Sequence, residues 1–234
     1  MTSHLTGLEG AAVARLREVT TVIWDFNGTL IDDLDLVVWS VNAQLTRRGL
    51  SPLTPSAYRD VFGFPIEDYY RRIGLGFETE TMAELAADFF AEYAPKLGDC
   101  GLHDGVPEVL GAFSDAGIRQ FVLSAMEEGM LRSMLAHLGI ASFFEGIYGL
   151  AHQEGDSKLT RGAELLRDFE IDPASAMMIG DTDHDAEVAA ALGLSTALVA
   201  SGHQSKRRLR EAGAAVFQDA QAIVDAWRGN GDET

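Results

Sequence analysis

The sequence contains a single cysteine among 234 residues, and this scarcity limits its chemistry. Cys100 alone can form neither an internal disulfide nor a cysteine-based zinc site. This cysteine usage is typical of a reducing compartment, so we expect a cytoplasmic protein. The N-terminal residues include Glu9 and no basic-then-apolar block, and we therefore expect no signal peptide.

Basic residues are also few, with 18 Lys and Arg against 36 Asp and Glu and a formal net charge of −18. Nucleic acids are bound by clustered Lys and Arg, so this balance argues against nucleic acid as a partner. No apolar run approaches the about 20 residues of a membrane span, which argues against a membrane partner. A small anionic substrate remains compatible, because a metal and one lysine can make a site locally positive.

Short apolar runs are present, and they are typical of buried strands at 21–24, 120–123, 146–149, 176–179 and 196–199. Helical stretches separate the last four runs, at 129–138, 160–169 and 185–192. Alternating strands and helices predict an α/β fold, a Rossmann-like three-layer core with a parallel sheet covered on both faces. The segment 9–18 predicts an extra helix packed on this core.

The long stretch between the first two strands contains no convincing strand. Its pattern is helical, at 35–48, 55–61, 66–73 and 80–97. In the last of these, Leu85, Phe89, Tyr93 and Leu97 recur every four residues, as on one face of a helix. The block predicts a helical cap domain at 33–102, inserted into a core formed by 1–32 and 103–234. Hinges are expected at 32–33 and 102–105, and the tail 229–234 is expected to fray.

Polar residues follow successive strands where those strands end. Asp25 ends the first strand, Ser124 ends the second and Lys158 opens a later helix. Asp181 and Asp185 follow the fourth strand in a Gly-Asp-x-x-x-Asp spacing. The carboxyl ends of parallel strands meet in one crevice, so we expect these five side chains to lie together.

These residue types suit phosphoryl transfer. Asp25, Asp181 and Asp185 would repel one another without a divalent cation, and their hard oxygens suit Mg²⁺. Ser124 can hydrogen-bond a phosphoryl oxygen, and Lys158 can neutralise its charge. Asp25 is then free to attack phosphorus and form an aspartyl-phosphate. Each residue taken singly has an ordinary explanation as a turn, a cap or a solvated side chain, but the ordered set favours a site.

The motifs resemble those of the haloacid dehalogenase-like hydrolase superfamily, over about residues 20–200. The run Asp-Phe-Asn-Gly-Thr-Leu at 25–30 is similar to its first motif, Asp-x-Asp-Gly-Thr-Leu. Residues 121–124 are similar to the second motif, Lys158 to the third, and Gly180 to Asp185 to the fourth. The helical insert, with Gly-Phe-Pro-Ile at 63–66, resembles the cap of phosphoglycolate phosphatases and β-phosphoglucomutases.

The resemblance implies a Mg²⁺-dependent phosphatase for a small phosphorylated metabolite, with phosphoglycolate as the leading substrate, and a monomer or homodimer. Asp25 would be the nucleophile and a metal ligand, and Asn27 would lend its backbone carbonyl to the metal. Asp181 would ligate the metal directly and Asp185 would support it. The substrate would contact residues of the core and arginines of the cap, namely Gly28, Ser124, Ala125, Lys158, Arg47 and Arg48, with Arg71 and Arg72 as further candidates.

Asn27 departs from the family pattern, in which a second Asp protonates the leaving oxygen and then activates water. An amide does neither near neutral pH, and such help is worth about 10²–10⁴-fold. Four explanations stay open. Another group such as His184 or His103 could substitute, the substrate could have a good leaving group, the Asn could be engineered, or the site could bind without turnover. A lyase that forms a Schiff base at Lys96 is a weaker alternative.

The stretch 201–208 is unusually basic for this chain and follows the fifth predicted strand. A loop that starts a helix is its ordinary interpretation. A contact with the substrate or the cap is the sharper alternative.

Overall fold

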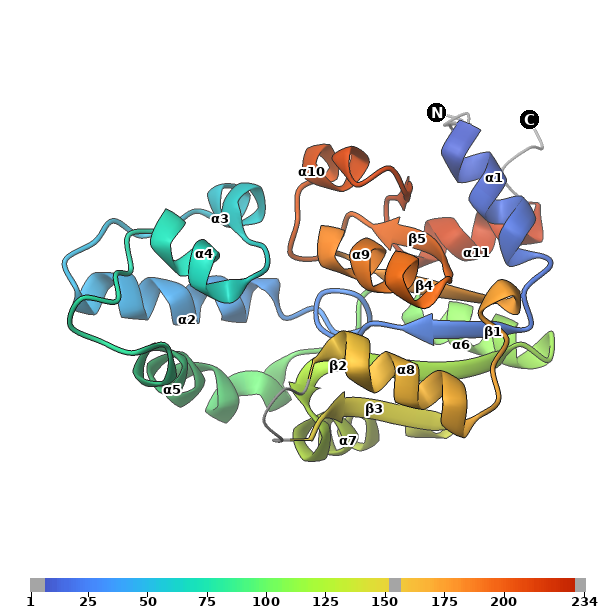
Figure 1. Cartoon of the computed structure of the whole chain (residues 1–234), viewed down its shortest axis with the longest axis horizontal. Coiled ribbons are helices and arrows are strands. Elements are labelled where there is room, and N and C mark those ends of the chain that lie inside the picture. Colours follow the sequence, from blue (N-terminus) through green and yellow to red (C-terminus); the bar gives the residue numbers. More distant parts are fainter. Residues whose placement is uncertain (1–6, 152–156, 230–234) are drawn as a thin grey trace.

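The computed structural model describes residues 7–151 and 157–229, which fold into a parallel sheet between layers of helices (Figure 1). The sheet has six strands in the order β3-β2-β1-β4-β5-β6, and every neighbouring pair is parallel. The strands are β1 (Thr21–Trp24), β2 (Arg119–Glu127), β3 (Gly146–Leu150), β4 (Ala176–Gly180), β5 (Ser195–Val199) and β6 (Ala215–Phe217). The predicted α/β fold is confirmed, and β6 adds a strand that the sequence did not suggest.

The central strand β1 is buried throughout because it has neighbours on both edges and helices on both faces. Val22 and Trp24 belong to the apolar cluster on one face of the sheet, whereas Ile23 belongs to the cluster on the other. The strand order reverses between β1 and β4. Open α/β sheets bind ligands beside the carboxyl ends of the strands at such a switch point. The strand order therefore predicts a ligand site beside the carboxyl ends of β1 and β4.

Helices cover both faces of the sheet. One face packs against α1 (Gly7–Leu16), α6 (Val106–Asp115), α7 (Glu128–His137) and α11 (Ala220–Arg228). The other packs against α8 (Lys158–Asp168) and α9 (Asp183–Leu192), and α10 (Lys206–Glu211) lies near β6. Two short 3₁₀ turns, Ala141–Phe143 and Pro173–Ser175, complete the core. No helix within the described residues combines the length and apolar character needed to cross a membrane.

A group of helices follows β1 and lies at the end of the molecule opposite the termini (Figure 1). This helical insert comprises α2 (Leu34–Arg47), α3 (Pro55–Val61), α4 (Ile66–Arg72), α5 (Met82–Tyr93) and the 3₁₀ helix Ala94–Asp99. It has an apolar cluster of its own, which includes Leu45, Tyr58 and Leu85. The single helix expected at 80–97 is divided after Tyr93, because Pro95 cannot donate the hydrogen bond that would continue α5.

The chain enters and leaves the helical insert at adjacent points. Ile31 forms an antiparallel bridge with Leu102, and the amide of Asp32 donates to the carbonyl of Gly101 at 2.9 Å. Both crossings lie beside the carboxyl end of β1. The expected tail beyond Gly229 falls outside the described residues.

Candidate active site

Three buried carboxylates meet where β1 and β4 end. Each of Asp25, Asp181 and Asp185 has an oxygen within 4.8 Å of the others. Asp25 follows β1, and its amide extends the pairing with β4 by donating to the carbonyl of Ile179 at 2.8 Å. Asp181 follows β4, and Asp185 lies in the first turn of α9. As expected from their positions after parallel strands, Asp25, Asp181 and Asp185 lie close together.

Lys158 is the cation of this cluster. Its ammonium group is buried, donates to Asp25 and lies 2.6 Å from Oδ1 of Asp185. Its position is fixed by the start of α8, where the hydroxyl of Ser157 accepts from the amide of Thr160 at 3.1 Å. Burial alone would lower the pKa of Lys158, but the two carboxylates raise it, so the lysine stays charged.

One lysine does not neutralise three carboxylates. Burial raises the pKa of Asp25 to about 6, against the opposing effect of Lys158. Burial also raises the pKa of Asp181 to about 8, against the opposing charge of His203 and with further contributions from Asp25 and Asp185. Asp185 differs, because Lys158 overcomes the effect of burial and lowers its pKa. Negative charge on Asp25 and Asp181 thus lacks a full partner within the described residues.

The donor set fits a hard divalent cation. All three side chains offer oxygen, which Mg²⁺ prefers. Asp185 is held from behind, since its Oδ2 accepts from the amides of Asp181 and Thr182 and from the Thr182 hydroxyl at 2.7–3.1 Å. The capping role considered for Asp185 is therefore real and coexists with its place in the cluster.

Glycine is required at position 28. Gly28 has φ of 72°, and a Cβ there would lie 2.4 Å from Oδ2 of Asp181 and 2.5 Å from the ring of His203. The backbone of the first motif can therefore approach the carboxylate cluster only without a side chain. Ser124 lines the same cavity as the cluster but lies within β2 rather than at its end, and its hydroxyl accepts from the amide of Met126 at 3.1 Å.

Asn27 faces a buried carboxylate that the sequence did not identify as part of the site. Its amide nitrogen donates to Oδ2 of Asp33 at 2.8 Å and lies 2.9 Å from the hydroxyl of Tyr93. The Tyr93 hydroxyl donates to the same Asp33 oxygen at 2.7 Å, and the amide of Gly28 donates to the other at 3.0 Å. The surroundings of position 27 thus accept hydrogen bonds from an amide.

His203 completes this network from the loop after β5. Its Nε2 lies 3.0 Å from Oδ1 of Asp33, and its Nδ1 lies 3.2 Å from the hydroxyl of Tyr58. Burial would lower the pKa of His203, but Asp33 raises it to about 9. The same pairing lowers the pKa of Asp33 despite its burial. The two form a buried ion pair beside Asn27.

The sequence carried faint signals for this network. The sequence indicates Asp33 only as part of a hinge, His203 only as part of the basic stretch and Tyr93 only as part of an apolar helix face. Asp33 lies six residues after Asn27 in the loop that follows β1, and His203 follows the end of β5, so both occupy the edge of the sheet where ligands bind.

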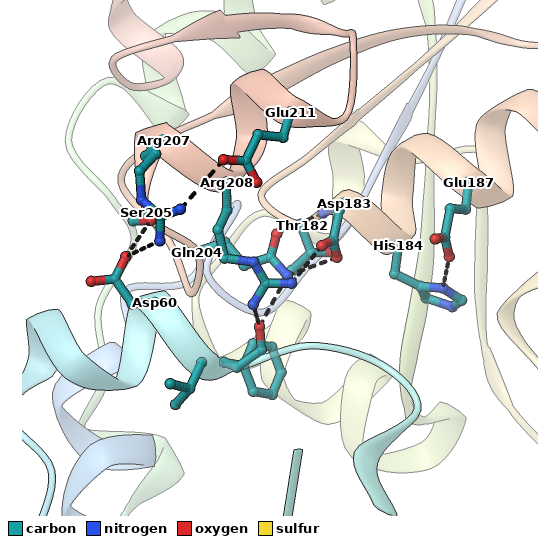
Figure 2. Close-up of polar contacts among 12 residues, drawn as sticks. Asp60, Thr182, Asp183, His184, Glu187, Gln204, Ser205, Arg207, Arg208 and Glu211 are labelled. Atoms are coloured by element: carbon teal, nitrogen blue, oxygen red, sulfur yellow. Dashed lines mark hydrogen bonds and ion pairs between the residues drawn. The ribbon is translucent and has the colours of Figure 1, made fainter. Parts of the chain in front are cut away.

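Of the two histidines proposed as substitutes for the missing acid, only one lines the cavity. His103 is not among the residues that line the cavity described below, and its Nδ1 is 3.9 Å from Asp32. His184 does line the cavity, where it stacks on Phe64 with ring centroids 4.5 Å apart. Its Nδ1 lies 3.2 Å from Glu187 on the same helix (Figure 2).

The arginines expected to select the substrate are occupied within the helical insert. Arg47 pairs with Asp88 and Glu92, and Arg48 pairs with Glu80 and Asp88, at 2.5–2.8 Å. Neither lines the cavity, and the same holds for Arg71 and Arg72. Acidic residues on and before α5 attract Arg47 and Arg48 away from the site, so the structure does not support the substrate contact expected of them.

The basic stretch fits both of its interpretations, because it leads into α10 and also contacts the helical insert. Arg208 donates to the carbonyl of Phe62 and pairs with Asp183 at 2.6 Å, while Ser205 donates to Asp60 at 2.8 Å (Figure 2). In return, Arg59 donates to the carbonyls of Gly202 and Ser201 at 2.6–2.8 Å. We call these contacts between residues 59–62 of the helical insert and residues 201–208 the clasp.

A cavity of about 290 Å³ lies between the carboxylate cluster and the helical insert. The core contributes a mostly polar floor, with Asp25, Ser124, Lys158 and Asp181 beside the apolar Ala125. The helical insert contributes mostly aromatic and aliphatic side chains, namely Val37, Val41, Tyr58, Phe62, Phe64, Ile66, Tyr69, Tyr70, Met82, Ala86, Phe89, Phe90 and Tyr93. A ligand can therefore place a phosphate at the floor and an apolar group under the insert.

Comparison with known proteins agrees with this geometry. A phosphoglycolate phosphatase from Rhodospirillum rubrum is 31% identical over 222 residues, which cover 89% of this chain and 90% of the relative. The solved structure of Protein Tyrosine Kinase A from Mycobacterium tuberculosis has a TM-score of 0.74 at 26% identity and covers 92% of this chain and 99% of that chain.

The fold recurs more widely. A haloacid dehalogenase-like family hydrolase from Streptococcus pneumoniae has a TM-score of 0.76 at 19% identity, covering 88% of this chain and 97% of that chain. The family model of the haloacid dehalogenase-like hydrolases matches residues 22–199, which include all but the first residue of β1, the strands β2 to β5, the helical insert and all three clustered aspartates. The chain therefore belongs to the haloacid dehalogenase-like hydrolases.

Proposed function

We propose that the protein hydrolyses a small soluble phosphomonoester with Mg²⁺, through an aspartyl-phosphate on Asp25. At the coarser level, its family and its phosphoglycolate phosphatase relatives make it a phosphoric monoester hydrolase. The observation that supports the finer proposal is the cluster of Asp25, Asp181 and Asp185 around Lys158 at the floor of the cavity. The helical insert would act as the cap.

The residues of the floor divide the work. Asp25 would attack phosphorus, because it follows β1 directly and lines the cavity. Lys158 and the hydroxyl of Ser124 would hold the phosphoryl oxygens, and Lys158 also keeps Asp25 oriented. Asp25 and Asp181 would ligate Mg²⁺, with Asp185 and the backbone carbonyl of Asn27 in support. Bound Mg²⁺ would supply charge neutralisation for the phosphoryl group.

The substrate is less well supported than the reaction. Phosphoglycolate is the candidate that the name of the Rhodospirillum rubrum relative suggests. The helical insert lines the cavity without a lysine or arginine, so it offers neither of these cations to the carboxylate of that substrate. The name of the mycobacterial relative also describes phosphoryl transfer, which is the chemistry that an aspartate nucleophile serves.

A second candidate function is phosphate-ligand binding with very slow turnover or none. Asn27 supports it, since an amide at this position supplies no general acid or base. The hydrogen bonds from Asn27 to Asp33 and with Tyr93 suit an amide, and this favours Asn27 as the native residue over an engineered replacement.

Phosphate release separates the two candidates. Release from a panel of phosphomonoesters and acyl phosphates should require both Mg²⁺ and Asp25, and Asp25→Asn should reduce it to background. The matched control is Asp115→Asn, which removes an exposed carboxylate at the end of α6. Binding of phosphate esters without release would favour the binding module, and release unaffected by Asp25→Asn would contradict the proposal.

A further inference from the structure

The helical insert builds an apolar chamber, whereas the leaving group of phosphoglycolate is a charged acid. Building on the proposed function, we infer that the substrate is an aryl phosphate, a phosphate monoester of a phenol, whose ring occupies this chamber. Two independent features carry the inference: the composition of the chamber wall and the amide at position 27.

The chamber wall is aromatic on the side of the insert. It is lined by Tyr58, Phe62, Tyr69, Phe89, Phe90 and Tyr93. These rings already pack edge to face and in stacks, as in the contacts of Phe62 with Tyr58 and Tyr69 at centroid distances of 5.1 and 5.2 Å. A planar ring gains both burial and such packing there, which a short polar leaving group cannot.

The helical insert offers no positive charge to this chamber. Arg47 and Arg48 pair with acids of the insert, and Arg59 is held by two carbonyl oxygens of the core. The other cations point elsewhere, with Arg71 on Asp68, Arg72 on the carbonyl of Val61 and Lys96 over the ring of Trp39. A leaving group with a carboxylate or a second phosphate would lose its hydration here without gaining a lysine or arginine of the insert as an ion-pair partner.

The chamber also contains one unused polar atom. The hydroxyl of Tyr69 is buried and has no hydrogen-bond partner among the described residues. Burial raises the pKa of Tyr69, so the group stays a neutral hydroxyl. A ring that carries a polar substituent would supply the partner that the protein does not.

The amide of Asn27 fits the same class of substrate. A phenol has a pKa of about 10, whereas an alkyl alcohol lies near the value of about 15.7 for water. A phenolate therefore departs without a proton from the enzyme, and an alkoxide does not. Loss of the family's acid at position 27 is therefore tolerable for release of an aryl leaving group and severe for release of an alkyl one, whereas the loss of water activation in the second step is the same for both.

The reaction balances without a co-reactant. A carboxylate oxygen of Asp25 forms a bond to phosphorus, and the bond between phosphorus and the aryl oxygen breaks with its electron pair on the phenolate. Water then attacks the aspartyl-phosphate, which releases inorganic phosphate and restores the Asp25 carboxylate. The attacking water releases one proton to solvent and the phenolate takes up one proton from solvent, so the protons balance.

The test compares an aryl leaving group with an alkyl group of similar size and with a small charged one. Values of kcat/KM would be measured with Mg²⁺ for phenyl phosphate, cyclohexyl phosphate and phosphoglycolate. We expect phenyl phosphate to exceed each of the others at least 100-fold, and substituted phenyl phosphates to react faster as the phenol pKa falls. Equal or better hydrolysis of phosphoglycolate or cyclohexyl phosphate would overturn the aryl substrate while leaving the hydrolase intact. Absence of Asp25-dependent release from every ester would instead overturn the proposed function.

A charge introduced into the wall tests the chamber itself. Phe90 lines the chamber and is 49% exposed, so Phe90→Arg can fold with its stem along the surface. We expect it to lower kcat/KM for phenyl phosphate and raise the ratio for phosphoglycolate over phenyl phosphate at least tenfold. Leu8→Arg is the matched control, since Leu8 is 55% exposed on α1 and lies outside the chamber. An unchanged ratio in Phe90→Arg would contradict an aryl group in this chamber.

Discussion

The imidazole Nε2 of His203 lies 3.0 Å from Oδ1 of Asp33, and this ion pair is buried next to Asn27. Members of the superfamily that this chain resembles carry a carboxylate at position 27 itself. Here the carboxylate nearest to that position belongs to Asp33, and the amide of Asn27 donates to it at 2.8 Å. Asn27 is thus the hydrogen-bond donor and Asp33 the acceptor, and changing either residue alone removes this donor–acceptor match.

Asn27→Asp alone is expected to destabilise the protein and to add little activity. The new carboxylate would face Asp33 across a hydrogen-bond distance, and two buried carboxylates at that separation cannot both ionise. The double variant Asn27→Asp/Asp33→Asn restores a donor and an acceptor, so it should recover part of the stability, the part that does not depend on the ion pair of Asp33 with His203. Melting temperature and phosphate release would be measured for wild type, both single variants and the double. A single Asn27→Asp variant that is both faster and equally stable would refute the match.

The pair of His203 and Asp33 is expected to make stability depend on pH in metal-free protein. The pKa of His203 is raised to about 9 when folded, so its contribution is complete below the unfolded value of about 6.5 and is lost as pH rises through 9. Urea unfolding in EDTA should show wild type losing on the order of 1–3 kcal/mol between pH 6.5 and 9.5 relative to His203→Gln. His137→Gln, in an exposed histidine of α7, controls for loss of an imidazole. Parallel curves for wild type and His203→Gln would argue against the ion pair.

Mg²⁺ is expected to stabilise the protein through Asp181. At 100 times the dissociation constant, ligand binding adds about 2.7 kcal/mol, which is roughly 5–10 °C for a chain of this length. Asp181→Asn should abolish this shift, yet be at least as stable as wild type in EDTA above pH 8, since it removes a buried charge. Scanning calorimetry with Mg²⁺ and with EDTA would show both effects. A full Mg²⁺ shift in Asp181→Asn would exclude it as a ligand.

The clasp is expected to hold the helical insert down mainly through Arg208. Its side chain is 16% exposed and joins Asp183 to the carbonyl of Phe62, whereas Arg207 is 65% exposed and pairs with Asp60 at 3.2 Å. Arg208→Ala should therefore speed hydrogen exchange of the amides at 58–62 by about tenfold or more, and Arg207→Ala should change it little. Equal effects of the two substitutions would show that the clasp acts through surface charge alone.

Much of the fold and of the carboxylate cluster could be predicted because the signals are local. Asp25, Lys158 and Asp185 each adjoin a short apolar run or a helix start, and the parallel arrangement then brings them together. In contrast, β6 has only three residues, too few for a period to be recognised.

The sequence could not predict which residues form ion pairs and hydrogen bonds with the long side chains. Arg48 looked like a substrate ligand because its acids, Glu80 and Asp88, lie more than thirty residues further along the chain. Tyr93 fitted an apolar stripe so well that its hydroxyl, which reaches Asp33 at 2.7 Å, was overlooked. Such pairings depend on how α2 and α5 pack, and periodicity does not encode that packing.

The adjacent crossings at residues 31–32 and 101–102 have a consequence for how the chain tolerates change. Because the bridge of Ile31 with Leu102 brings both ends of the helical insert together, the core closes at the same two points whatever lies between them. For a flexible loop, each doubling of length costs only about 0.6 kcal/mol in closure entropy. The insert can therefore be lengthened, shortened or exchanged for another with little effect on the sheet. New leaving-group specificities can accordingly be grafted onto an unchanged phosphoryl-transfer floor.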